Sequence, residues 1–139
     1  MVQLLLNIRP SAANLGQMSR SPLHPTREQI ELPMVLDCLS DPTRLGIICG
    51  LEKYDRAGVE LRCGDFNAFG AKSNLAYHFA RLREAGLVQV RQVGTARYVK
   101  LRRKDLDARF PGLMDAVIKS ASRDAGRLQL AECEVVRAG

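Results

Sequence analysis

The side chains best suited to do chemistry in this sequence are its four cysteines, because a thiolate can bind a metal, react with an oxidant or form a disulfide. They are Cys38, Cys49, Cys63 and Cys133, far apart and without a C-x-x-C spacing. That pattern argues against a disulfide scaffold and against a structural zinc site. Cys38, Cys49 and Cys63 remain candidates for thiol sensing.

Two features support the thiol hypothesis. Cys38 and Cys49 fall in neighbouring predicted helices, where they could approach within disulfide range. Cys63 follows Arg62 and lies near a predicted helix start, which predicts a lowered thiol pKa. The alternative is that these thiols are inert, Cys38 and Cys49 as small core residues.

Other chemistry is poorly represented. The two histidines, His24 and His78, are far apart, and no nucleophile stands at a recognisable spacing from a base. No phosphate-binding loop or metal-ligand constellation is present. We therefore expect a protein that is not an enzyme and that needs no cofactor or metal.

Composition is that of a soluble domain with a core. Of the 139 residues, 46% are hydrophobic and 26% are charged. The early apolar run at residues 2–8 is too short to cross a bilayer and lacks the flanks of a signal peptide. We expect a cytoplasmic location.

The positive charge is concentrated in one block of the chain. Residues 72–104 hold nine basic residues and one acid, whereas the whole chain has a net charge of +6. Such a block is the electrostatic footprint of a polyanion-binding element. The alternative is the solvated basic face of any helical domain.

Local patterns predict three domain parts: a flexible leader at 1–26, a domain at 27–122 and a tail at 123–139. A helix with more than one apolar face starts near Ile30, with Pro33 in its first turn. A second helix runs to about residue 54, with Asp41 as N-cap and Pro42 at the first helical position.

The most regular helix covers residues 71–86 and ends at Gly86 as its C-terminal cap. Its apolar residues gather on one arc and its polar residues on the other. Two alternating stretches around Gly94 and Thr95 predict a β-hairpin, and a further helical pattern at 106–121 is interrupted at Pro111. The order predicts a mainly α fold with a small β-hairpin wing, a winged helix-turn-helix.

Two motifs make this order specific. The stretch "LSDPTRLGIICGL", followed by "SNLAYHFARLREAGLVQVRQVGTARYVKL", resembles the ArsR family of winged helix-turn-helix transcriptional repressors over about residues 30–120. The resemblance implies a homodimer, with helices at both ends of the domain packed across the two-fold axis. It also implies binding to a double-stranded DNA operator that an inducer weakens; the inducer is unknown.

The expected DNA-binding residues lie on the polar arc of the 71–86 helix and on the wing. Asn74 is suited to adenine, whereas Lys72 and Arg81 suit phosphates. His78 lies beside the apolar arc, where packing and phosphate contact are both open. The full set is Lys72, Ser73, Asn74, Tyr77, His78, Arg81, Arg91, Thr95 and Arg97.

Apolar faces on the first and last helices predict the dimer interface, because a lone domain of this size does not need both. The alternative is that the two faces pack on each other within one chain. The residues expected at the interface are Leu32, Val35, Leu36, Leu113, Met114, Val117 and Ile118.

Metal sensing of the kind found in the family is not supported by these residues. Where relatives carry Glu-Leu-Cys-x-Cys-Asp-Leu, this chain reads "ELRCGDF", with Arg62 and Gly64 in place of the thiol ligands. The last helix also lacks a histidine for the family's other metal site. We expect the segment to cap a helix instead, through Asp65 as N-cap.

The leading interpretation is thus a homodimeric, sequence-specific repressor. Two alternatives remain: a thiol- or redox-responsive repressor that uses Cys38, Cys49 or Cys63, and a winged-helix module that docks a protein. Salt-dependent binding to duplex DNA distinguishes the repressor from the protein-docking module.

Overall fold

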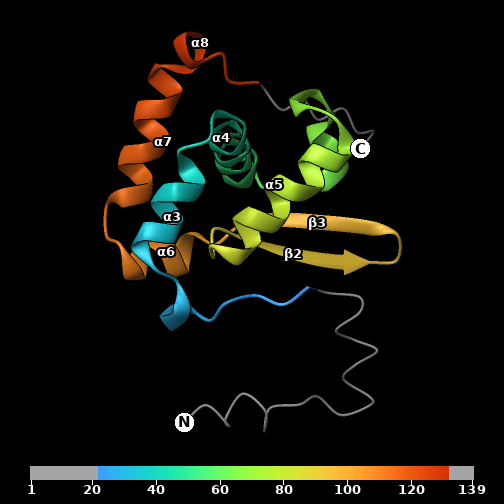
Figure 1. Cartoon of the computed structure of the whole chain (residues 1–139), viewed down its shortest axis with the longest axis horizontal. Coiled ribbons are helices and arrows are strands. Elements are labelled where there is room, and N and C mark those ends of the chain that lie inside the picture. Colours follow the sequence, from blue (N-terminus) through green and yellow to red (C-terminus); the bar gives the residue numbers. More distant parts are fainter. Residues whose placement is uncertain (1–21, 132–139) are drawn as a thin grey trace, which may run out of the picture.

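The computed structural model describes residues 22–131. Helices form most of this part, with a three-stranded antiparallel sheet at one side (Figure 1). The expected mainly α fold with a β-hairpin wing is confirmed. None of the helices in the described range is long and apolar enough to cross a membrane.

The first helices begin where local chemistry favours them. Helix α3 (Leu32–Leu39) carries Pro33 in its first turn, after the short 3₁₀ helix η1 (Arg27–Gln29). Helix α4 (Pro42–Arg56) starts after Asp41, whose Oδ2 accepts a hydrogen bond from the backbone N–H of Arg44 at 3.0 Å. The predicted N-cap is therefore confirmed.

The segment around Cys63 differs from the prediction. Strand β1 (Leu61–Arg62) leads into the 3₁₀ helix η2 (Cys63–Phe69), and Arg62 occupies the N-cap position. Asp65 is the third residue of that helix, and its carboxylate accepts the backbone N–H of Arg62 at 2.7 Å. Asp65 thus caps the helix from inside the first turn, because that distance suits a carboxylate reaching back to the N-cap.

Helix α5 (Lys72–Glu84) ends at a glycine, as predicted. Gly86 has φ +85°, and a Cβ atom there would lie 2.5 Å from Cγ1 of Ile30. Glycine alone accommodates both the left-handed backbone and this close approach. The turn thereby directs the chain from α5 into the wing.

The wing is a regular hairpin of strands β2 (Val88–Val93) and β3 (Ala96–Leu101), and its tip is at Gly94 and Thr95. In register, Val88 lies opposite Leu101, and the strand order is β1-β3-β2. The hairpin reaches beyond the neighbouring helices (Figure 1).

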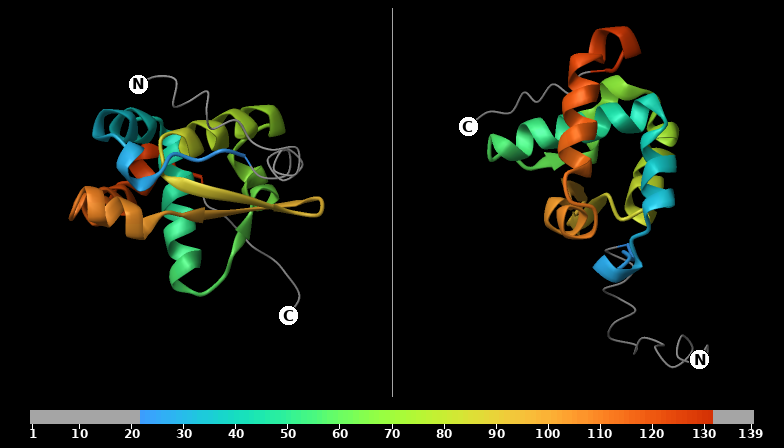
Figure 2. Two further views of the ribbon diagram at one scale, coloured as in Figure 1. Left: turned by 90° about the horizontal axis from the view of Figure 1, so that it is seen from below. Right: turned by 90° about the vertical axis from the view of Figure 1, so that its left-hand side faces the viewer.

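The chain then returns to the helical side through α6 (Arg103–Arg109), α7 (Leu113–Arg123) and the short α8 (Ala125–Leu128). The break between α6 and α7 falls at Pro111, as expected. Figure 2 shows α7 crossing beside α4, and the two helices are in contact.

One core joins the helices to the sheet. Phe66, at 0% exposure, lies edge-on to both Phe69 and Phe79, with ring centroids 5.4 Å apart in each pair. These three rings fix η2 against α5. The core therefore sets the orientation of α5, the helix whose outer face carries the candidate DNA contacts.

Residues 22–26 contact the domain that we expected to begin at residue 27. Arg83 donates to the carbonyl of Leu23, and Arg102 donates to the carbonyl of Pro25 at 2.8 Å. The ring Nε2 of His24 accepts the backbone N–H of Val90 at 2.9 Å. Residues 22–26, which we expected in the leader, therefore run along edge strand β2.

Candidate nucleic-acid interface

The outer face of α5 presents side chains that can read bases. Ser73, Asn74 and Tyr77 are exposed on it, Tyr77 to 58%. Neither Ser73 nor Asn74 forms a side-chain hydrogen bond to any described residue. Their donors and acceptors are thus available to a base edge.

Helix η2, the turn at Gly70 and α5 form a helix-turn-helix unit. Gly70 has φ +142°, and the aromatic contacts of Phe66 fix the angle at which α5 leaves the turn. The wing follows α5 directly, so both elements are held by one core. This arrangement of α5 and hairpin is that of a winged helix-turn-helix.

The two wing arginines lie on opposite faces of the hairpin. Side chains alternate along a strand, so Arg97 shares the face of the buried Val99, whereas Arg91 shares the face of Tyr98, its partner in register. Arg91 donates two hydrogen bonds of 2.8 Å to Glu60 and lies over the Tyr98 ring at 4.9 Å. Thr95 is exposed at the tip.

Arg81 points partly inward. Its Nη2 lies 3.0 Å from Oδ2 of Asp37 on α3, and its side chain is 37% exposed. This pair was not predictable from the sequence, because the two residues are 44 positions apart. Arg81 therefore ties α5 to α3, whatever contact it makes with a phosphate.

His78 packs against α4. Its side chain is 16% exposed, and Nδ1 lies 3.2 Å from Nη1 of Arg44 and 3.9 Å from Oδ2 of Asp41. Arg44 is itself buried and donates to the carbonyl of Cys38 at 2.7 Å. Of the two roles considered for His78, the structure favours packing between α5 and α4.

Lys72 and Arg97 differ from the other expected basic contacts. Both are exposed, and neither forms an ion pair or hydrogen bond with a residue in the range 22–131. They lie on α5 and on the wing face that turns toward α5. These two charges are therefore free to meet a phosphate or another anion.

The three described thiols lie in environments that raise their pKa values. Burial raises the pKa of Cys38 to about 11, and burial also raises the pKa of Cys49 and Cys63. The lowered pKa predicted for Cys63 is wrong, because desolvation outweighs the nearby positive charge of Arg97. All three are free thiols, and Cys133 lies outside the described residues.

Within residues 22–131, no group of three or more His, Cys, Asp or Glu side chains could hold a metal ion.

Two features of residues 22–131 were not recognised in the sequence. One is the contact of residues 22–26 with the wing. The other is a hollow between α5 and the wing, flanked by the small residues Ala76 and Ala80. The signal in the sequence that could have indicated this hollow was the spacing of the two alanines, four residues apart and close to Lys72 and Arg83.

The predicted dimer faces are only partly available. Val35 and Met114 are both 0% exposed and belong to the core of the chain itself, so they offer no surface to a partner. Leu32 and Leu36 are 40% and 47% exposed. Leu113, Val117 and Ile118 are partly buried against the core.

Taken together, the helix-turn-helix unit, the exposed polar face of α5 and the adjoining hairpin define a winged helix-turn-helix regulator. The chain is 36% identical over 88 residues to the uncharacterized HTH-type transcriptional regulator YceK of Bacillus subtilis (strain 168). The match covers 60% of this chain and 82% of that protein. No family model matches the chain. The chain belongs to the HTH-type transcriptional regulators, a class of DNA-binding proteins.

Proposed function

We propose that this regulator is a homodimeric repressor that binds a specific duplex operator and leaves it in response to a signal. The observation that carries the proposal is the exposed polar face of α5 beside a wing that carries an unpaired cation. Asn74 would read a base, with Ser73 and Tyr77 beside it. Lys72, Arg97 and Thr95 would contact the sugar-phosphate backbone.

The remaining expected contacts take positioning roles in this proposal. Arg81 holds α5 to α3 through Asp37, and Arg91 stiffens the wing through Glu60 and Tyr98. Arg81 can still touch a phosphate with its exposed part. His78 packs inside and contacts no DNA. The ArsR-type resemblance supports the repressor role and the use of two half-sites.

Binding to DNA is tested by selecting bound duplexes and then measuring affinity by fluorescence anisotropy at two salt concentrations. With several phosphate contacts in a dimer, affinity should fall by roughly 10³-fold between about 50 and 200 mM salt. Scrambled duplexes should bind more weakly than the selected operator at both salt concentrations. Absence of any duplex binding at the lower salt contradicts the proposal, and a salt-insensitive protein partner would favour the docking-module alternative.

The dimer proposal rests on an open apolar groove between α3, α4 and α7. The groove is lined by Leu36, Leu39, Leu45, Val117, Ala121 and Leu128, and its volume is about 430 Å³. A second copy would cover the exposed Leu36 with its own helices. The folded domain proposed here spans 22–123, because residues 22–26 are held against it and α7 ends at Arg123.

Sedimentation measurements test the dimer. Leu36→Glu places a charge in the groove and should shift the chain from dimer to monomer. Val93→Glu is the matched control, since Val93 is 50% exposed on the wing and does not line the groove. A wild-type chain that sediments as a monomer, or a dimer unaffected by Leu36→Glu, contradicts this interface.

The repressor role is tested in cells with a reporter placed downstream of the selected operator. Expression of the wild-type chain should lower reporter output, and expression of the Asn74→Ala variant should lower it less. A rise in output with the wild-type chain would indicate an activator.

A further inference from the structure

A hollow separates the inner flank of α5 from the wing. Its volume is about 450 Å³, within the range of roughly 300 to 1,000 Å³ typical of small-molecule sites. Leu75, Phe79 and Val90 form an apolar floor, and each is at most 7% exposed. Ala76 and Ala80 leave room at the α5 side because their side chains are short. The floor suits an apolar body of modest size.

The rim of this hollow is positive. Lys72, Arg83 and Arg97 line it, and no acidic residue does. Lys72 and Arg97 have no ion pair among the described residues, whereas Arg83 donates to the carbonyl of Leu23 and lies 3.9 Å from the carboxylate of Glu84. Two unneutralised cations above an apolar floor favour a ligand with an anionic head and an apolar body.

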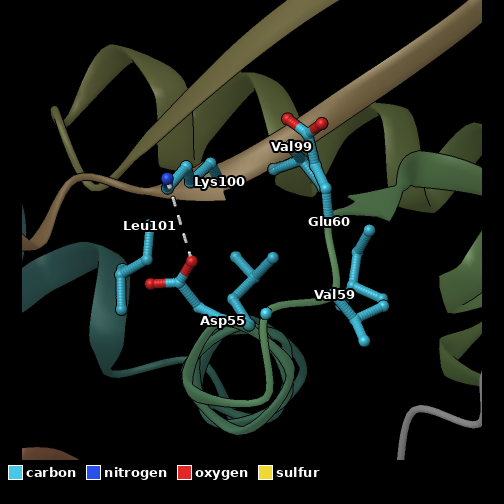
Figure 3. A pocket seen from close by; sticks show the side chains of 9 residues that line it. Asp55, Val59, Glu60, Val99, Lys100 and Leu101 are labelled. Atoms are coloured by element: carbon cyan, nitrogen blue, oxygen red, sulfur yellow. Dashed lines mark ion pairs between the residues drawn. The ribbon is translucent and has the colours of Figure 1, made fainter.

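Another hollow shows the contrast. It lies between α4 and the other end of the sheet, and Figure 3 shows Lys100 and Asp55 facing each other across it. Their charged atoms are 3.9 Å apart, and Glu60 also lines the wall. The charges of that hollow are therefore largely balanced by the protein itself. At the hollow beside α5, only Arg83 has such a partner, and Lys72 and Arg97 have no ion pair within the described residues.

The sequence argues against the chain's own leader as the occupant. Residues 1–21 contain Arg9 and Arg20 and no acidic residue. A basic segment would be repelled by three cations at the rim. A separate anionic molecule fits the charge of the site better.

We propose that the hollow between α5 and the wing binds a small apolar monocarboxylate, which acts as the releasing signal. The regulatory part rests on the proposed function. The carboxylate pairs with Lys72 and Arg97, and the apolar body lies on Leu75, Phe79 and Val90.

Release follows because the ligand uses the two cations that DNA needs. A carboxylate bound by Lys72 and Arg97 removes two phosphate contacts per chain. Ligand and operator then weaken each other's binding by the same factor, as linkage requires. Two lost phosphate contacts should weaken operator binding by at least tenfold at moderate salt.

The binding site is tested without DNA, by calorimetry of the full chain with decanoate. Decanoate should bind once per chain, and 1-decanol, which lacks the charge, should bind at least tenfold more weakly. Arg97→Gln should weaken decanoate binding by about tenfold. Lys100→Gln is the matched control on the opposite face of the same strand and should leave it unchanged.

Several results would overturn the site. One is that decanoate does not bind at all, and another is that 1-decanol binds equally well. The site is also overturned if equimolar inorganic phosphate displaces decanoate, or if Arg97→Gln binds decanoate with the affinity of the wild type. None of them bears on operator binding, which is measured separately. Failure of the site and failure of the DNA-binding proposal are therefore distinguishable.

The signalling role is tested by operator binding with and without saturating decanoate. The wild-type chain should lose at least tenfold in affinity. Ala80→Phe fills the hollow from the α5 side, so this variant should bind operator like the wild type and no longer respond to decanoate. Circular dichroism checks its fold. Decanoate that binds the wild-type chain without weakening operator binding would overturn the signalling role.

Discussion

The basic block at residues 72–104 contains two kinds of cation, held and free. Arg81, Arg91 and Arg103 are held by carboxylates from other elements, whereas Lys72 and Arg97 are not paired within the described chain. The held cations join helices and stiffen the wing. Lys72 and Arg97 lie on α5 and on the wing face that turns toward it. Charge counted along a sequence therefore overstates the charge that a partner molecule meets.

Arg103 is the clearest held cation. Its guanidinium lies 3.1 Å from Glu52 on α4, 3.2 Å from Asp107 on α6 and 2.6 Å from Asp115 on α7. Glu52 is buried and also meets Arg56 at 2.6 Å. Three helices thus meet at one side chain, which predicts an effect on stability.

The largest expected effect is on folding, from Arg103→Gln. Loss of the charge leaves the nearly buried Glu52 with fewer partners, so the free energy of unfolding should fall by about 2 kcal/mol. Urea unfolding measures it. Lys104→Gln is the control, because Lys104 is exposed and has no ion pair in the described range. Similar small losses in both variants would contradict the division into held and free cations.

A smaller effect is expected at the base-reading position. Asn74→Ala should reduce the preference for the selected operator over a scrambled duplex by about 1–2 kcal/mol, because a bidentate amide contact to adenine is lost. Anisotropy with both duplexes measures the ratio. Equal losses on the two duplexes would show that Asn74 does not read a base.

A weaker, pH-dependent effect is expected where residues 22–26 meet the wing. Burial, with the charges of Arg83 and Arg102, lowers the pKa of His24 below 6.5. The unfolded chain then binds the proton more tightly, so this contact stabilises fully above about pH 6.5 and is lost as pH falls through the lower folded pKa. A protonated ring also cannot accept the N–H of Val90.

Hydrogen exchange of the Val90 amide tests this contact. After correction for the intrinsic rate, protection should fall roughly two- to threefold on acidification to about pH 5. His24→Gln should remove the pH dependence, since an amide oxygen accepts at either pH. If protection of the Val90 amide in the wild-type chain does not change with pH, the proposed role of His24 is contradicted.

The smallest effect is expected from the thiols. Their raised pKa values leave little thiolate at neutral pH, so peroxide should not change operator affinity, and replacing all four cysteines by serine or alanine should make no difference. A wild-type chain that loses binding after peroxide, beside a substituted chain that does not, would restore the thiol-sensor alternative.

Local features of the fold followed from the sequence. Asp41, Gly86 and the hairpin tip each have a local chemical reason, and the structure confirms all three. Most of the ion pairs were not predictable, because Asp37, Glu60 and Glu52 lie 44, 31 and 51 positions from Arg81, Arg91 and Arg103. Only Asp107, four positions from Arg103 on the same helix, is a local partner. The prediction of Asp65 as N-cap was wrong, because Arg62 occupies that position and Asp65 caps the helix from its third residue.

The hollow between α5 and the wing was not predictable either, because its residues come from separate elements. Nothing in the sequence shows that Arg97 turns toward α5 while Arg91 turns away, until strand register is known. The resemblance pointed to the correct class of regulator. It did not reveal which cations remain free.

The most direct test of the division between held and free cations is the salt dependence of operator binding in two wing variants. Arg97→Gln should reduce the magnitude of the slope of log affinity against log salt by about 1.8, because the proposed dimer loses one phosphate contact per chain and each contact contributes about 0.9. Arg91→Gln should leave the slope unchanged, because its charge is already paired with Glu60. Equal reductions in both variants, or a reduction in Arg91→Gln alone, would contradict this division.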